Sequence, residues 1–231
     1  MRPQPAVHRA IVLIDVEGFS HHERTNAHQA QLRADLYDSI EQAFAEAGIP
    51  WCDCHHEDRG DGVLVLVPPE VVKSLLVESL PWSLIKELRR RNALRPAAAR
   101  LRIRLALHAG EVVFDPHGVT GTALNTAFRL LEAPPLKQAL AKSPGVLALI
   151  TSPWFYEEVV RHTPASEPTS FHQVTVSVKE TITLAWICLP DNPYTQTTAD
   201  PPTSLTIVLD PKAHVVLIIA PSDHALRMPV Q

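Results

Sequence analysis

The clearest chemical signal in this sequence is a pair of acidic residues, each at the end of a predicted strand. Asp15 follows the apolar run 10–14, and Asp61 lies in a Gly-Asp-Gly turn that opens the apolar run 63–67. If the two strands are neighbours, both carboxylates converge on one edge of a sheet. Paired carboxylates supply the oxygen ligands that hard divalent cations prefer, and such cations also bind nucleotide phosphates. The simpler alternative is that each Asp only satisfies backbone N–H groups at a turn; the two segments together, in this order, favour a metal site.

A second candidate group is formed by an asparagine and an arginine on one predicted helix. Asn125 and Arg129 are four residues apart within the predicted helix 121–132. Side chains at this spacing share a helix face. Taken by themselves, they are also what the exposed face of an amphipathic helix carries.

Four segments resemble, in order, motifs of the class III nucleotidyl cyclases, the catalytic domain of adenylate and guanylate cyclases. They are Ile14-Asp-Val-Glu-Gly-Phe-Ser20, Arg59-Gly-Asp-Gly-Val63, Leu101-Arg-Ile-Arg-Leu-Ala-Leu-His-Ala-Gly110 and Gly121-Thr-Ala-Leu-Asn-Thr-Ala-Phe-Arg129. Their order and spacing cover residues 8–190. The resemblance implies a soluble enzyme that converts a nucleoside triphosphate to a 3′,5′-cyclic nucleotide and pyrophosphate.

The resemblance also implies a role for each candidate residue. Asp15, Asp61 and the Val16 carbonyl would hold two divalent cations, Mg²⁺ or Mn²⁺, while Asn125 would orient the ribose and Arg129 would neutralise the α-phosphate. The reaction moves charge among phosphate oxygens, so it needs cationic groups more than covalent chemistry.

Two more residues are expected at the triphosphate. Gly18-Phe19 is expected to lead into a helix whose first amides could meet the phosphates, which makes Phe19 a substrate-binding candidate. Lys179, in Val178-Lys-Glu180, resembles the phosphate-binding lysine that the family carries late in the domain.

The choice of base depends on two positions that the resemblance picks out. Glu57, four residues before Asp61, stands where the family reads the base, and glutamate there goes with guanine. The partner position, three residues before Gly121, is Gly118, where the usual Asp or Cys is missing. Guanine and a pyrimidine therefore both remain open. Some bacterial relatives in anti-phage signalling make cyclic pyrimidine monophosphates as second messengers, and a short cyclase fits that setting.

Class III cyclases share their active sites between two subunits, one giving the metal carboxylates and the other the Asn and Arg. One chain here carries both sets, so the resemblance implies a homodimer with two equivalent sites. The alternative is a degenerate cyclase-homology domain that binds nucleotide or a partner without turnover, which Gly118 favours. A ferredoxin-like relative of polymerases or diguanylate cyclases is a weaker rival, because no Gly-Gly-Asp-Glu-Phe-like turn is present.

The elements that must position these residues alternate as βαββαβ with additions, a ferredoxin-like α/β sandwich. Periodicity and breakers predict strands over 10–16, 51–56, 62–67, 101–109, 146–150, 174–178 and 183–189, and helices over 26–47, 70–92, 121–132, 136–142 and 153–161. The catalytic domain is expected over 1–190, a Pro-rich linker over 191–204 and a C-terminal β-hairpin extension over 205–231.

Composition sets the remaining bounds. The 231 residues are 45% hydrophobic and 20% charged, which suits a globular domain, and the net charge of −4 does not favour a nucleic-acid binder. Three cysteines make no disulfide framework and favour the reducing cytoplasm. The most apolar late stretch, 215–220, is far shorter than the ~20 residues of a membrane-spanning helix.

Overall fold

A computed structural model describes residues 5–192, 206–209 and 215–218. Contacts divide the chain into two units, Met1–Tyr194 and Thr195–Gln231, and each is described by itself. The predicted linker 191–204 lies outside the described residues except for Asp191 and Asn192. The three-part division of the chain stays a prediction.

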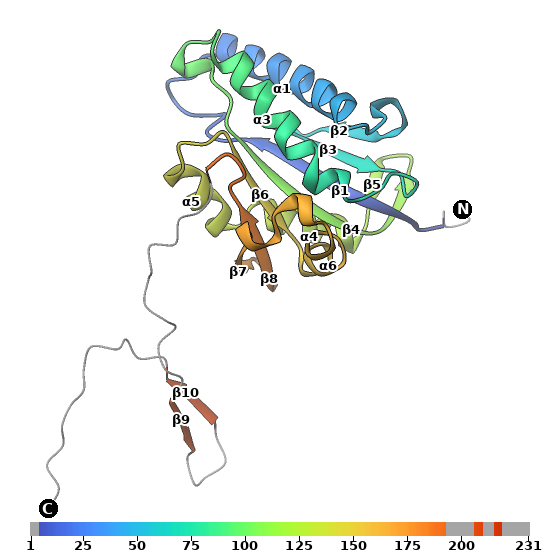
Figure 1. The fold of residues 1–231 in the computed structure, drawn as a ribbon, viewed down its shortest axis with the longest axis vertical. Helices are drawn as coiled ribbons and strands as arrows, with labels where there is room; N and C mark the ends of the chain where they lie inside the picture. Colours follow the sequence, from blue (N-terminus) through green and yellow to red (C-terminus); the bar gives the residue numbers. More distant parts are fainter. Residues whose placement is uncertain (1–4, 193–205, 210–214, 219–231) are drawn as a thin grey trace, which may run out of the picture. The chain divides into compact units, whose positions relative to one another are not determined.

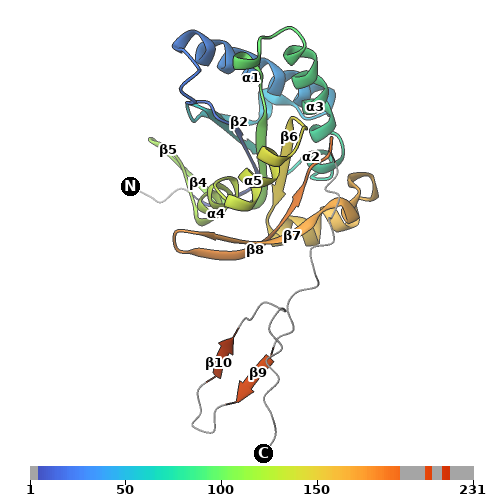
Figure 2. The ribbon, with the colours of Figure 1, turned by 90° about the vertical axis from the view of Figure 1, so that its left-hand side faces the viewer.

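The larger unit is built on one mixed sheet of eight strands (Figures 1 and 2). In chain order the strands are β1 (Val7–Val16), β2 (His55–Asp58), β3 (Gly62–Val67), β4 (Ile103–Asp115), β5 (Gly118–Thr120), β6 (Leu147–Thr151), β7 (His172–Val178) and β8 (Thr181–Cys188). Their spatial order is β2-β3-β1-β4-β6-β8-β7, with β5 paired to β4. The neighbours β1, β3 and β4 are antiparallel, and only β4 and β6 are parallel.

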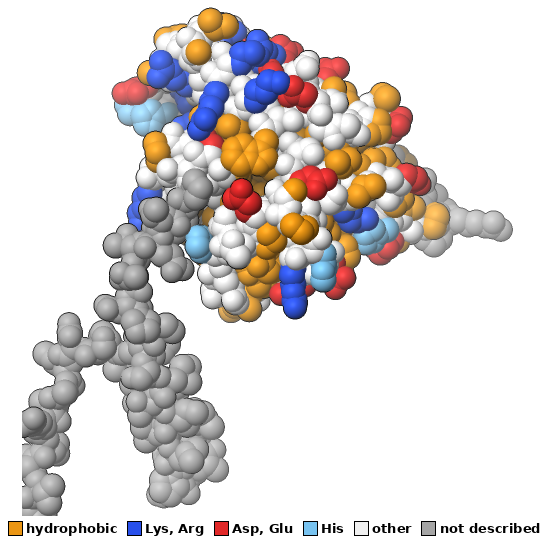
Figure 3. Space-filling model, viewed as in Figure 1, with side chains coloured by type: hydrophobic (Ala, Val, Ile, Leu, Met, Phe, Trp, Pro, Cys, Tyr) orange, Lys and Arg blue, Asp and Glu red, His pale blue; other side chains and the backbone are white. Residues whose placement is uncertain are grey.

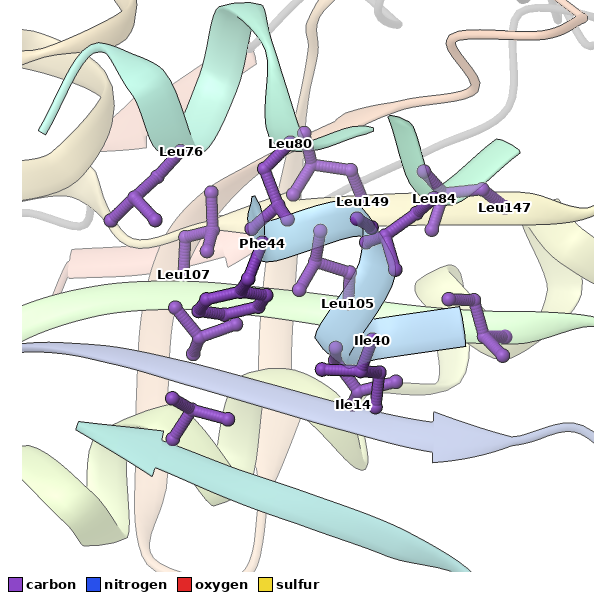
Figure 4. Close-up of a cluster of buried hydrophobic side chains, with 14 of the residues drawn as sticks. Ile14, Ile40, Phe44, Leu76, Leu80, Leu84, Leu105, Leu107, Leu147 and Leu149 are labelled. Carbon is purple, nitrogen blue, oxygen red and sulfur yellow. The ribbon is translucent and has the colours of Figure 1, made fainter. Parts of the chain in front are cut away.

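Helices cover both faces of this sheet. They are α1 (Asn26–Glu46), α2 (Leu75–Glu78), α3 (Leu80–Asn92), α4 (Thr122–Leu131), α5 (Pro134–Lys142) and α6 (Pro153–Glu158). We call one side the α1/α3 face and the other the α4/α5 face. Alternation along β1 serves both, because Val12 and Ile14 join the core under α1 and α3 while Ile11 and Leu13 join the core under α4 and α5. Figure 4 shows the first core, where Phe44 and Ile40 of α1 lie over the strands.

The α/β fold class expected from the sequence is confirmed, and most predicted elements are present. Helix α1 matches its predicted start at residue 26. Its N-cap Thr25 accepts a hydrogen bond from the His28 amide, and the His28 ring accepts one from the Thr25 amide. This reciprocal cap satisfies N–H groups that a helix start leaves free.

Other boundaries differ from the prediction, mainly at prolines. The predicted helix 70–92 is instead α2 and α3, because Pro81 occupies the first turn of α3, where a missing N–H costs nothing. Pro134 likewise begins α5 instead of only ending α4. Residues Trp51–Asp53, predicted as strand, form a 3₁₀ turn after Pro50. The short strand β5 is absent from the prediction.

The C-terminal hairpin is present as a pair of strands. Strand β9 (Thr206–Leu209) runs antiparallel to β10 (Val215–Ile218), with Leu209 opposite Val215. No helix in the described part of the chain is long and apolar enough to cross a bilayer.

The basic run at the end of α3 has a structural role. Arg89 pairs with Asp191, and Arg90 with Glu87 of its own helix. Arg91 contacts both Asp35 and Asp38 of α1. Figure 3 shows Lys and Arg side chains gathered over the part of the surface that α1 and α3 occupy, with acidic side chains beside them. Arg91 therefore links α3 to α1 and Arg89 links α3 to the segment after β8, while Arg90 pairs within its own helix.

Candidate active site

The strand register brings the two candidate metal carboxylates to one edge of the sheet. Asp15 lies opposite Gly62 of β3 on one side and opposite Arg104 of β4 on the other. Asp61 immediately precedes β3, and its carbonyl accepts a hydrogen bond of 2.9 Å from the amide of Val16. Asp15 follows Ile11 and Leu13 in alternation, so its side chain belongs to the α4/α5 face. Asp15, Val16 and Asp61 therefore form one local group.

Arg104 clamps the carboxylate of Asp15 through two hydrogen bonds. Its Nε donates to Oδ1 and its Nη2 to Oδ2, both at 2.7 Å. Only 16% of the Asp15 side chain and 12% of the Arg104 side chain are exposed. Burial raises the pKa of Asp15, the hydrogen bond and charge of Arg104 lower it, and the charge of Asp61 raises it again, which leaves this pKa above its ordinary value. Arg104 and the charge of Lys137 therefore do not fully offset the cost of burying this carboxylate beside Asp61.

This donor set fits a divalent cation that also binds substrate. The described residues hold no group of three or more His, Cys, Asp or Glu suited to a metal. The side-chain ligands available at this sheet edge are the two carboxylates of Asp15 and Asp61. Mg²⁺ is typically bound by one or two carboxylates, with water and substrate phosphates completing its shell. A cation bound there would offset the cost of burying the Asp15 carboxylate beside Asp61. An ion bound at Asp15 has to share or displace the guanidinium of Arg104.

Asn125 and Arg129 lie on α4, and Asn125 is exposed. Arg129 is 85% covered and turns toward the β7–β8 hairpin, where its Nη2 donates to Glu180 Oε1 at 3.0 Å. Its Nε is buried without a hydrogen-bond partner. No hydrogen bond or ion pair within the described residues joins Asn125 or Arg129 to Asp15 or Asp61. Within one chain, the Asp15–Asp61 half and the Asn125–Arg129 half of the predicted site therefore form two separate groups.

Lys179 belongs with Arg129 rather than with the carboxylates. It lies in the two-residue turn between β7 and β8, with φ +50°, and its side chain is exposed. Its neighbour Glu180 is the partner of Arg129, so Lys179 and Arg129 lie at the same end of the α4/α5 face.

Phe19 departs from its expected role. Its side chain is half-buried and contacts the core of the α1/α3 face. The helix to which Gly18-Phe19 leads does not begin beside this pair. Residues 17–20 form a turn, in which the His21 amide donates to the Gly18 carbonyl at 2.9 Å, and α1 begins only at Asn26. Phe19 anchors this loop on the core. The adjacent Gly18, with φ +62°, marks a turn.

Glu57 is the centre of a polar cluster on β2, which we call the Glu57 cluster. His55 Nε2 lies 3.0 Å from Glu57 Oε1, and Arg59 Nη2 lies 2.6 Å from Oε2. The Arg59 guanidinium lies over the ring of Phe128 on α4, 5.4 Å from its centroid. Gly118, expected to face Glu57, does so, since a Cβ added there would lie 3.2 Å from Glu57 Oε1.

Sequence reasoning missed Arg104, His55 and Arg59 as members of this region. Arg104 stands on the polar side of the alternating segment 101–109, but only the register with β1 places it opposite Asp15. His55 and Arg59 flank Glu57 at spacings of two, which on a strand means a shared face. That spacing is the signal that could have found them.

Comparison with known proteins identifies the fold. No protein-family model matches the sequence, and no curated protein matches it either. Among solved structures, an adenylate/guanylate cyclase/hydrolase from Silicibacter pomeroyi is 21% identical and matches with a TM-score of 0.56 over 81% of this chain and 99% of that one. The guanylyl cyclase Cya2 is 17% identical, with a TM-score of 0.52 over 80% of this chain and 93% of that one. A bacterial light-regulated adenylyl cyclase is 13% identical, with a TM-score of 0.51 over 82% and 93%. The chain thus has the fold of adenylate and guanylate cyclase catalytic domains.

Proposed function

We propose that this protein is a nucleotidyl cyclase, which converts a nucleoside triphosphate to its 3′,5′-cyclic monophosphate and pyrophosphate. The observation that carries the proposal is the meeting of Asp15 and Asp61 at one sheet edge, where burial raises the pKa of Asp15, on a cyclase-type fold. A perturbed carboxylate with a second acidic group beside it is typical of functional sites.

In the proposed reaction the ribose 3′-hydroxyl attacks the α-phosphorus of the same nucleotide, a P–O bond forms, and the bond to the leaving pyrophosphate breaks. Asp15 and Asp61, with the Val16 carbonyl, would hold two divalent cations, Mg²⁺ or Mn²⁺, which when bound neutralise the triphosphate and favour ionisation of the attacking hydroxyl. Arg104 keeps the Asp15 carboxylate in one orientation at the edge of the sheet. Such preorganisation avoids reorientation of the carboxylate during the reaction.

The other half of the proposed site lies on α4 and the β7–β8 turn. Asn125 would hold the ribose, Arg129 would neutralise charge on the α-phosphate and Lys179 would contact the triphosphate. The buried, unpartnered Nε of Arg129 supports a ligand at this position. Before nucleotide binds, Glu180 occupies the guanidinium of Arg129, and its side chain, 74% exposed, can move away at little cost.

We further propose a homodimer with two shared sites. Because no hydrogen bond or ion pair within the described residues joins Asn125 or Arg129 to Asp15 or Asp61, a second copy would supply them. A two-fold axis would pair each half with its complement and produce two equivalent sites.

The proposed substrate is GTP or a pyrimidine triphosphate. Glu57 offers acceptors for guanine N–H groups, while Gly118 leaves its side of the Glu57 cluster without a side chain. A cyclic pyrimidine nucleotide would place the protein in anti-phage signalling, with its product as a second messenger.

The test is to incubate the purified chain with Mn²⁺ and each of ATP, GTP, CTP and UTP, and to identify the products by mass spectrometry. We expect one cyclic nucleotide with pyrophosphate in equal amount, and none from a matched Asp61→Asn protein. Absence of any cyclic product, from protein shown to be folded and dimeric, would overturn the proposal.

A second candidate function is nucleotide binding without turnover. The observations that favour it are the missing side chain at Gly118 and the occupation of both Asp15 oxygens by Arg104. Calorimetric titration with the same four nucleotides separates the candidates, since a degenerate domain would bind one of them and return it unchanged.

A further inference from the structure

His55 and Glu57 share one side of β2, and both point to the face that carries Asp15. In the β2–β3 register, His55 lies opposite Leu66 and Glu57 opposite Leu64. Directly paired residues of antiparallel strands project to the same side, and both leucines belong to the core of the α4/α5 face. His55 is therefore a neighbour of the proposed base-reading residue on the substrate side of the sheet.

The carboxylate of Glu57 is held at both oxygens by residues of its own strand region. His55 Nε2 meets Oε1 at 3.0 Å and Arg59 Nη2 meets Oε2 at 2.6 Å. An ionised carboxylate only accepts hydrogen bonds, so the His55 ring carries its proton on Nε2 and donates. The ring is itself braced by Phe114 of β4, edge to face, with centroids 5.1 Å apart. Only 22% of the Glu57 side chain is exposed.

The oxygen held by His55 is the one that faces Gly118. An added Cβ at Gly118 would lie 3.2 Å from Oε1, against 3.9 Å from Oε2. Gly118 has φ +131°, a conformation that favours glycine, so the chain presents no side chain there. Residue 118 therefore offers no side chain to restrain Oε1, which is held by the hydrogen bond from His55 while Arg59 holds Oε2.

We propose that His55 is a positioning residue for base recognition, acting through Glu57. This inference rests on the proposed function, because it assigns how the base-reading carboxylate of that same site is oriented. With His55 in place, Oε1 is presented at a fixed angle to the incoming base. Without it, Glu57 samples other rotamers, and discrimination between bases falls even though Glu57 itself is present.

The test compares His55→Ala and His55→Gln with His56→Gln as the matched control. His56 lies opposite Val65, points to the other face of the sheet and stacks on Trp51 with centroids 4.4 Å apart. A glutamine at 55 retains an N–H donor near the position of Nε2. For each variant, KM and kcat are measured with ATP, GTP, CTP and UTP.

For His55→Ala we expect the ratio of kcat/KM between the best and second-best nucleotide to fall by about threefold to tenfold, mainly through KM, as for loss of one partly exposed charged hydrogen bond. His55→Gln should restore most of the ratio, and His56→Gln should leave it unchanged. An unchanged ratio in His55→Ala would overturn the inference, and so would a glutamine variant no better than alanine.

A double-mutant cycle with Glu57→Ala tests whether His55 acts through Glu57. If it does, His55→Ala has no further effect on the ratio in the Glu57→Ala background, whereas additive effects would overturn the inference. The same variants are titrated with non-hydrolysable triphosphate analogues, and the ratio of Kd values replaces the kinetic ratio. If the wild-type chain forms no cyclic nucleotide, the proposed function fails, while these Kd ratios still decide the role of His55.

Discussion

Two buried aspartates in this molecule are each gripped by an arginine through two hydrogen bonds, yet their pKa values move in opposite directions. Asp35 of α1 accepts from Arg95 at 2.7 and 2.9 Å, and Arg91 adds a contact at 3.3 Å. Burial raises the pKa of Asp35, but the hydrogen bonds and charges of Arg95 and Arg91 outweigh it, and the pKa lies below its ordinary value. Asp15, with Arg104 alone and with Asp61 nearby, has a raised pKa.

Burial is the largest single influence on both pKa values, and the direction of each shift depends on how far the basic neighbours offset it. Asp35 is bound by two arginines, whereas Asp15 is bound by Arg104 alone, with Lys137 acting only through its charge, and it also faces Asp61. An ion pair that is fully compensated holds a fold together, as Asp35 does between α1 and the end of α3. An undercompensated pair is poised to take up a further cation, which is the requirement of the proposed metal site.

The largest expected effect separates the two aspartates by activity. Asp15→Asn and Asp61→Asn should each lower kcat about a hundredfold or more, because each removes a ligand charge that stabilises the transition state. Asp35→Asn should leave kcat per folded molecule within about twofold, since Asp35 lies on the other face. Rates are measured with the preferred nucleotide and Mn²⁺. Residual activity above about a tenth of wild type in either metal-site variant would contradict the assignment.

Mixing two inactive variants tests whether the Asp15–Asp61 half and the Asn125–Arg129 half of the proposed site come from different subunits. Asp61→Asn and Arg129→Ala should each be inactive alone, since each damages one half of every site. An equal mixture that exchanges subunits should recover about a quarter of wild-type activity, because half of the dimers are mixed and each of those has one intact site. Exchange is verified with differently tagged chains. No recovery after proven exchange would place the complete site within one chain.

Stability should respond in the reverse order to activity: Asp35→Asn should destabilise the fold more than Asp15→Asn. Asp35→Asn should lower the free energy of unfolding by about 2–3 kcal/mol at pH 7, because it leaves Arg91 and Arg95 without their buried partner. A lowered folded pKa stabilises the fold above the unfolded value of 3.8, and this contribution is lost as pH falls through the folded pKa. Asp15→Asn should lower stability by only about 1 kcal/mol, because the loss of the Arg104 pairing is partly offset by removal of a carboxylate whose burial already costs stability. Urea denaturation measures both, and equal losses would remove the distinction drawn above.

The last comparison concerns a partly buried histidine on the α4/α5 face, His108. Burial, with a contribution from His8, lowers its pKa from 6.5 to about 4, while its Nδ1 lies 2.7 Å from the Ser152 hydroxyl. A depressed folded pKa gives stability that is present above pH 6.5 and is lost as pH falls toward 4. We expect a loss of about 3 kcal/mol across this window in the wild type, and a flatter profile in His108→Gln. His117→Gln, at an exposed turn position, is the control; matching profiles for both variants would argue against His108.

The order of the elements around the site could be predicted from sequence because their patterns are local. The apolar runs before Asp15 and after Asp61 fix strands β1 and β3, and the helical spacing after Thr25 fixes α1. The boundaries that failed depend on context. Pro81 and Pro134 can stand in the first turn of a helix as well as end one. Strand β5 forms only because the chain turns back after β4 and pairs with the end of that strand.

The site was predictable as a set of residues but not as a set of contacts. That Asp15 and Asp61 meet follows from the neighbouring strands, which the pattern of apolar runs suggests. That Arg104 stands opposite Asp15 requires the register of β1 against β4, and that Glu180 holds Arg129 requires the position of the β7–β8 turn. Register and packing depend on residues far apart in the chain, which no local pattern reports.

Gly118 has a consequence for how this protein can evolve. Its backbone conformation disfavours any side chain, and a new Cβ would press against Glu57 at 3.2 Å. A single substitution that adds a side chain here would strain the β4–β5 turn. If the proposed site reads a base through Glu57, a new side chain at position 118 would reach that base only after a second change had reshaped the turn.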